Sequence, residues 1–74
     1  IKLYPNPSSN LININSVDVI SGVVIYDLLG KKVFAKSINK KEFSVDISSF
    51  NNDIYIVEFT NVNGENVFSK IIKD

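Results

Sequence analysis

Apolar residues recur at every second position over much of the chain, and residues that favour turns interrupt this alternation at intervals of roughly eight to twelve positions. The alternation is clearest in Leu11–Asn15 and Phe43–Ile47, where apolar and polar side chains take turns. Because successive side chains of a β-strand point to opposite faces, this period predicts half-buried strands and argues against helices. Val23–Asp27 begins with four successive apolar residues, which predicts a central strand covered on both faces.

Turns between these strands are predicted at three places. Asp27 can accept a hydrogen bond from the backbone two residues later, and Gly30 can take the positive φ of a type I turn followed by a bulge. The pair Asn63-Gly64 is typical of a two-residue hairpin turn in which both residues have positive φ. A polar turn is also expected at Asn39–Glu42.

The remaining segments complete the predicted order. Lys32–Ser37 is expected to pair with the central strand and to carry Val33 and Ala35 inward, and Ser48–Asp53 is expected to be a loop anchored by Phe50. The other expected strands are Val17–Ile20 (ending at Ser21-Gly22), Ile54–Thr60 and Val67–Lys73. With about six or seven short strands, the sequence predicts an all-β fold and a small immunoglobulin-like antiparallel β-sandwich, with a small barrel as the alternative.

Composition narrows the class of protein further. A chain of 74 residues is one domain of modest stability, and without cysteine its core must come from the 45% of residues that are hydrophobic. Eight basic and eight acidic residues give no net charge, which argues against a nucleic-acid binder, and no apolar run is long enough for a membrane helix. Five lysines are expected on solvated strand edges, where they discourage aggregation: Lys31, Lys32, Lys36, Lys40 and Lys41.

Candidate chemistry in the side chains is sparse. The chain has no His and no Cys, so no enzyme activity, metal or cofactor is predicted. Asp27, Asp46 and Asp53 are interpreted as turn-capping residues rather than paired catalytic acids. Tyr26 and Tyr55 stand inside apolar strands and are expected to pack in the core with the hydroxyl at its rim.

Four segments in a fixed order identify a family resemblance. They are Leu3–Pro7 (LYPNP), Ile25–Lys31 (IYDLLGK), Ile54–Val57 (IYIV) and the tail Lys70–Lys73 (KIIK). Together they resemble the type A C-terminal sorting domain of proteins exported by the Bacteroidetes type IX, or Por, secretion system. One departure is Asp53, which stands where the family usually has glycine, although aspartate tolerates the left-handed region better than most residues.

The resemblance implies a non-catalytic sorting signal with an immunoglobulin-like fold. Residues 1–74 would be a single domain, the C-terminal segment of a longer secreted protein, in keeping with a first residue, Ile1, that is not Met. The parent would pass through the periplasm to the cell surface or medium, and a sortase-like peptidase would remove the domain upstream of Ile1. The other implied partners are the type IX translocon and an outer-membrane shuttle protein. No nucleic acid and no membrane insertion are implied.

Two groups of residues match the family's motifs. Those expected to set the shape of the domain are Pro5, Asn6, Pro7, Asp27, Gly30 and Tyr55. Those expected to contact a receptor are Gly64, Lys70, Ile72 and Lys73, with both lysines facing solvent. The tail can be read simply as a half-buried last strand, or as an edge strand that a receptor pairs with or grips. The alternative function is an accessory immunoglobulin-like spacer or carbohydrate-binding module, which gives the chain end no special role.

Overall fold

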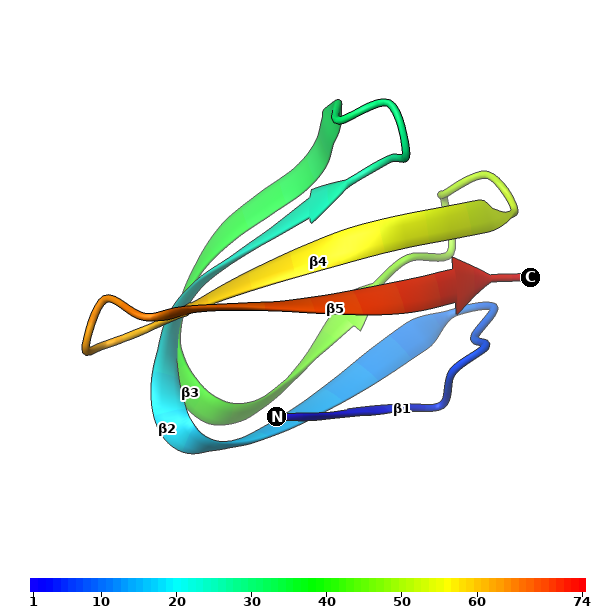
Figure 1. Cartoon of the computed structure of the whole chain (residues 1–74). Helices are drawn as coiled ribbons and strands as arrows, with labels where there is room; N and C mark the ends of the chain where they lie inside the picture. Colours follow the sequence, from blue (N-terminus) through cyan, green and yellow to red (C-terminus); the bar gives the residue numbers. More distant parts are fainter.

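The computed structural model describes all residues 1–74 and consists of strands, turns and loops. Its five strands are β1 (Lys2–Tyr4), β2 (Leu11–Tyr26), β3 (Lys32–Asp46), β4 (Asp53–Asn61) and β5 (Asn66–Lys73) (Figure 1). Every strand pair is antiparallel. No helix of the structure is long and apolar enough to cross a membrane. The predicted all-β fold class is confirmed.

Two long bent strands give the sheet its two layers. The first part of β2, residues 11–15, pairs with β1 and with the end of β3, whereas residues 20–26 pair with the start of β3 and with β4. Irregular pairing around Ile20 and Gly22 marks the bend, and Figure 1 shows β2 and β3 curling together there. One layer therefore has the order β1-β2-β3, and the other has the order β3-β2-β4-β5.

The bends explain why fewer strands form than the sequence suggested. The break expected at Ser21-Gly22 is a bulge inside β2, so the three segments expected between residues 11 and 27 belong to one strand. The turn expected at Asn39–Glu42 is wrong, because these residues lie within β3. Because β2 and β3 each contribute a segment to both layers, the chain still forms the predicted sandwich-like arrangement of short antiparallel segments.

The core lies between the two layers. Its eleven buried residues are Ile12, Ile14, Ile20, Val23, Ile25, Val45, Ile47, Tyr55, Val57, Phe59 and Ile71. Phe50 packs against this core as expected, but Val33 and Ala35 are exposed, and Phe34 packs inward instead. A register irregularity opposite Tyr26 shifts the start of β3 by one position, which exchanges its two faces.

The β2–β3 turn has the predicted geometry. Gly30 has φ 84°, and its N–H donates to the carbonyl of Asp27 at 3.0 Å. The Asp27 carboxylate accepts hydrogen bonds from the N–H groups of Leu29 and Lys31, both at 2.9 Å. This is a type I turn closed by a glycine bulge, with the aspartate as its cap.

The β4–β5 turn repeats that geometry and corrects the prediction of a two-residue turn. Gly64 has φ 82°, but no residue other than glycine has positive φ, so Asn63 does not. Asn61 takes the place of the aspartate: its side-chain oxygen accepts from the N–H groups of Asn63 at 2.9 Å and Glu65 at 3.0 Å. The loop is one residue longer than predicted, because the residues that pair to close it are Asn61 and Glu65.

The longest edge strand of the sheet is β3. This strand pairs only with β2, so its other side lacks a partner strand along both layers. The lysines predicted for solvated edges all lie in or beside β3, and all are exposed. Their expected placement on a strand edge is therefore confirmed.

Candidate functional site

The tail strand β5 has one inward side and one outward side. It pairs with β4 alone, with Ile54 opposite Ile72 and Ile56 opposite Lys70. Ile71 and Lys73 point inward and are buried. Lys70 and Ile72 lie on the outward side with Phe68, which is 61% exposed.

The backbone edge of β5 is already occupied near its end. The Asn6 side chain donates to the Lys70 carbonyl at 3.1 Å and accepts from the Ile72 N–H at 3.0 Å. The Ser8 N–H donates to the Ile72 carbonyl at 2.9 Å, and the Asp74 N–H donates to the Ser8 carbonyl at 3.0 Å. These four hydrogen bonds, hereafter the clasp, occupy the edge that a receptor strand would need.

The Pro-Asn-Pro motif positions the clasp. Pro5 and Pro7 fix the backbone φ on either side of Asn6, and both of their preceding peptide bonds are cis. Ser8 follows and is buried, with its hydroxyl donating to the Leu11 carbonyl at 2.7 Å. The motif and the tail, 64 to 66 positions apart in sequence, are thus in direct contact. Sequence reasoning gave the motif a shape-setting role without predicting this contact.

Lys73 does not face solvent, so that expectation is wrong. Only 8% of the residue is exposed, and its ammonium donates to the Asn52 side chain at 3.2 Å and to the Asp74 carbonyl at 3.4 Å. It lies two positions after buried Ile71, on the inward side of β5, where its aliphatic stem covers the core while its charged end reaches polar groups. Lys70, on the outward side, is exposed as predicted.

Tyr55 packs in the core as predicted. It is 5% exposed, its ring lies 5.1 Å from that of Phe50, and its hydroxyl donates to the Asn51 carbonyl at 2.8 Å. Burial raises the pKa of Tyr55 above its usual value, and the nearby charges of Asp53 and Asp27 raise it further. Asp53 itself is not in the left-handed region, since only glycines have positive φ here.

The expected role as a turn cap is confirmed for Asp27 and Asp46, whereas the Asp53 carboxylate accepts from the N–H of the next residue, Ile54, at the start of β4. The Asp46 carboxylate accepts from the Ser48 N–H at 2.9 Å, as the Asp27 carboxylate does in its own turn. Hydrogen bonds from the Ser48 side chain and backbone hold the pKa of Asp46 below its usual value. The structure brings together no group of three or more His, Cys, Asp and Glu side chains able to hold a metal ion.

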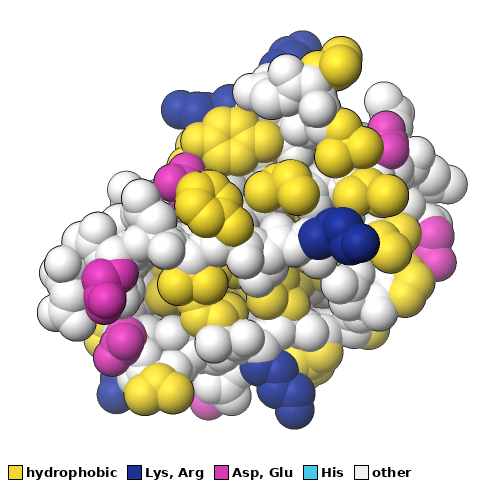
Figure 2. All heavy atoms as spheres, in the orientation of Figure 1, with side chains coloured by type: hydrophobic (Ala, Val, Ile, Leu, Met, Phe, Trp, Pro, Cys, Tyr) yellow, Lys and Arg dark blue, Asp and Glu magenta, His cyan; other side chains and the backbone are white.

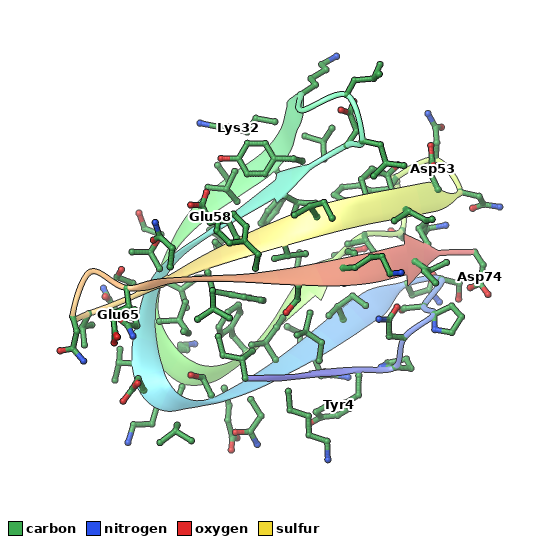
Figure 3. The ribbon with its side chains drawn as sticks, viewed as in Figure 1. Tyr4, Lys32, Asp53, Glu58, Glu65 and Asp74 are labelled. Atoms are coloured by element: carbon green, nitrogen blue, oxygen red, sulfur yellow. The ribbon has the colours of Figure 1, made fainter.

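Tyr26 lies outside the core, contrary to prediction. Val23 and Ile25 take the inward side of β2, so Tyr26 projects from the other side, where its hydroxyl donates to the Glu58 carboxylate at 3.0 Å. That hydrogen bond, together with partial burial and the charge of Glu58, raises the pKa of the tyrosine. Glu58 is labelled in Figure 3, where it projects from β4.

An apolar surface surrounds this pair on the outer side of the four-stranded layer. We define the outer face by six apolar residues of β2, β4 and β5: Val24, Tyr26, Ile54, Ile56, Phe68 and Ile72. Figure 2 shows apolar side chains gathered over these strands, with few charges among them. The outward side of β5 is thus one margin of a larger apolar surface.

The predicted contact residues do not form one cluster. Lys70, Ile72 and Lys73 lie near the end of β5, but Gly64 lies in the β4–β5 turn at the opposite end of that strand (Figure 1). Asp27 and Gly30 occupy the separate β2–β3 turn. The structure therefore joins the tail to Asn6 and not to the glycine turns.

Comparison with known proteins identifies related sequences. A family model described as "Secretion system C-terminal sorting domain" matches residues 2–74. A curated relative, "Beta-agarase D" of Zobellia galactanivorans, is 33% identical over 72 residues. The match covers 97% of this chain and 14% of that protein, so the chain spans a small part of the relative's length.

Proposed function

The chain belongs to the family of secretion-system C-terminal sorting domains, the sorting signals of type IX secretion, and we propose that its tail strand β5 carries the recognised side chains. A domain of this family marks its parent protein for the cell surface or the extracellular space, and such domains are generally non-catalytic. We propose the same lack of catalysis for this chain, and that residues 1–74 are the single C-terminal domain of a longer secreted protein.

The proposed partners are those of the type IX pathway. After transit through the periplasm, the translocon and an outer-membrane shuttle protein would recognise the folded domain. A sortase-like peptidase would then cut the parent upstream of Ile1. The family match over residues 2–74 carries this proposal.

The clasp favours recognition of β5 through its side chains over the addition of a receptor strand to its edge. A receptor that added a strand to the edge at Lys70–Lys73 would have to displace Asn6 and Ser8. The outward side chains Phe68, Lys70 and Ile72 are accessible without any such change. The proposal is therefore recognition through side chains, with the clasp intact.

A reporter fusion tests the function. Residues 1–74 are fused to the C-terminus of a periplasmic reporter in a host with a working type IX system, and the reporter is measured in periplasm, surface and medium. We expect export to the surface or medium, and retention when the domain is fused to the N-terminus of the reporter instead. Retention of the C-terminal fusion, in cells that export their own sorting-domain proteins, would favour the accessory-module alternative.

A further inference from the structure

The outer face is unusual for a surface that stays in water. In an antiparallel sheet with one solvated side, polar side chains normally occupy that side. Here Ile54 and Ile56 of β4 project outward beside Phe68 and Ile72 of β5. Phe68 is exposed and the other residues of the face are half-buried, and a contiguous apolar surface that water reaches marks interaction sites on soluble domains.

The outer face carries one carboxylate, that of Glu58, and one ammonium, that of Lys70, among its apolar residues. Glu58 stands opposite Phe68 and accepts the hydroxyl of Tyr26 at 3.0 Å. Lys70 stands opposite Ile56 and is exposed, so its cross-strand neighbour offers it no carboxylate. The face therefore presents one available ammonium beside apolar side chains, which is complementary to an apolar surface with a carboxylate.

A shallow hollow continues the face toward β3. Its volume is about 310 Å³, and it is lined by Gly22, Val24, Ala35, Ser37 and Thr60 together with Val23 and Lys36. Gly22 leaves the space open because it has no side chain, and a Cβ built there would touch only the Lys36 carbonyl, at 3.7 Å. The packing of the domain therefore does not require glycine at this position.

We propose that the outer face docks a partner protein whose contact surface is apolar and carries an acidic side chain opposite Lys70, with an apolar side chain of the partner in the hollow beside Gly22. This inference rests on the proposed function, because the partner would belong to the export pathway. Binding of a second copy through the same face is the alternative occupant, and the sedimentation experiment below tests it.

Paired substitutions in the reporter fusion test the proposal. Phe68→Asp and Lys70→Glu alter the outer face, and each is expected to lower export about tenfold or more, as loss of a central contact does. The matched controls are Leu29→Asp, at a residue 95% exposed in the β2–β3 turn, and Lys41→Glu, at an exposed residue of β3 that does not line the hollow. Both controls are expected to leave export unchanged. Far-ultraviolet circular dichroism and thermal unfolding of each purified domain verify folding, and Lys70→Glu remains a test if Phe68→Asp unfolds.

The outcomes separate this inference from the proposed function. If the unaltered fusion stays in the periplasm, the proposed function fails. If it is exported and the folded Lys70→Glu or Phe68→Asp domain is exported equally well, the outer-face inference is overturned while the function stands. Equal losses in the controls would also overturn it, since placement on the face would then be irrelevant. Sedimentation showing a dimer that Phe68→Asp dissociates would assign the face to a second copy and overturn the choice of partner.

Discussion

Removing the Asn6 side chain tests how firmly the Pro-Asn-Pro motif holds the tail. Asn6→Ala deletes both side-chain hydrogen bonds of the clasp, one to the Lys70 carbonyl and one from the Ile72 N–H. The backbone bonds of Ser8 to β5 remain possible in the variant, so the domain is expected to fold. The expected result is a less stable domain in which the end of β5 opens more often.

The magnitude follows from the number and exposure of these bonds. A typical hydrogen bond contributes about 0.5–1.5 kcal/mol, and both bonds lie in an exposed position where water can replace them, so we expect a loss of about 1–2 kcal/mol. For a domain of this size, each 1 kcal/mol lowers the melting temperature by about 4–8 °C. Asn6→Asp keeps the acceptor for the Ile72 N–H but loses the donor to Lys70, so its cost is expected to be of the same order.

Urea unfolding and amide hydrogen exchange measure the two effects. The midpoint should fall with an unchanged slope, and the Ile72 amide should exchange faster in Asn6→Ala than in the unaltered domain. Asn10→Ala, at an exposed residue before β2, is the control and should change neither. A stability change below about 0.5 kcal/mol, with Ile72 equally protected, would refute the clasp as a stabilising contact.

Further predictions concern turns, the buried lysine and pH. Gly30→Ala should cost about 1–2 kcal/mol through strain at φ 84°, whereas Gly22→Ala should be neutral or slightly stabilising; equal costs in urea unfolding would show that φ is not the cause. Lys73→Ala should cost about 1–3 kcal/mol because it removes a buried stem, and an effect below about 0.5 kcal/mol would contradict that packing. The raised pKa values of Tyr26 and Tyr55 mean that the folded state holds both protons more tightly, so their stabilisation is complete below about pH 10 and is lost as pH rises through the folded pKa values. Tyr26→Phe should weaken this alkaline loss in urea midpoints, and an identical pH profile would count against the hydrogen bond as its cause.

The sequence predicted the strand class because alternation is a local property. Phe43–Ile47 alternates, and Val45 and Ile47 are buried while Phe43 packs against the core. The β2–β3 turn was predictable for the same reason, since Asp27 and Gly30 determine its hydrogen bonds within five residues. The bends of β2 and β3 could not be predicted in this way, because the polar residues at Asn39–Glu42 are equally compatible with a turn and with an exposed edge strand.

Long-range contacts account for most of what sequence reasoning missed at the candidate site. The contact of Asn6 with β5 depends on two layers meeting, which no local pattern encodes. Whether Lys73 points inward or outward depends on which alternate residues of β5 face the core. The ending Lys-Ile-Ile-Lys has one lysine and one isoleucine on each side of the strand, so it is compatible with either orientation. The outer face was indicated in the sequence. Ile54–Phe59 is apolar on both sides of the strand apart from Glu58, and this pattern is typical of a strand covered on both sides.

Dependence of export on the type IX translocon tests the central claim most directly. The fusion of a periplasmic reporter to residues 1–74 is expressed in two otherwise identical hosts, one with the translocon and one without it. We predict that the reporter reaches the surface or medium only in the first host and accumulates in the periplasm of the second. Retention in both hosts, or release from both, would contradict the assignment of this chain as a type IX sorting signal.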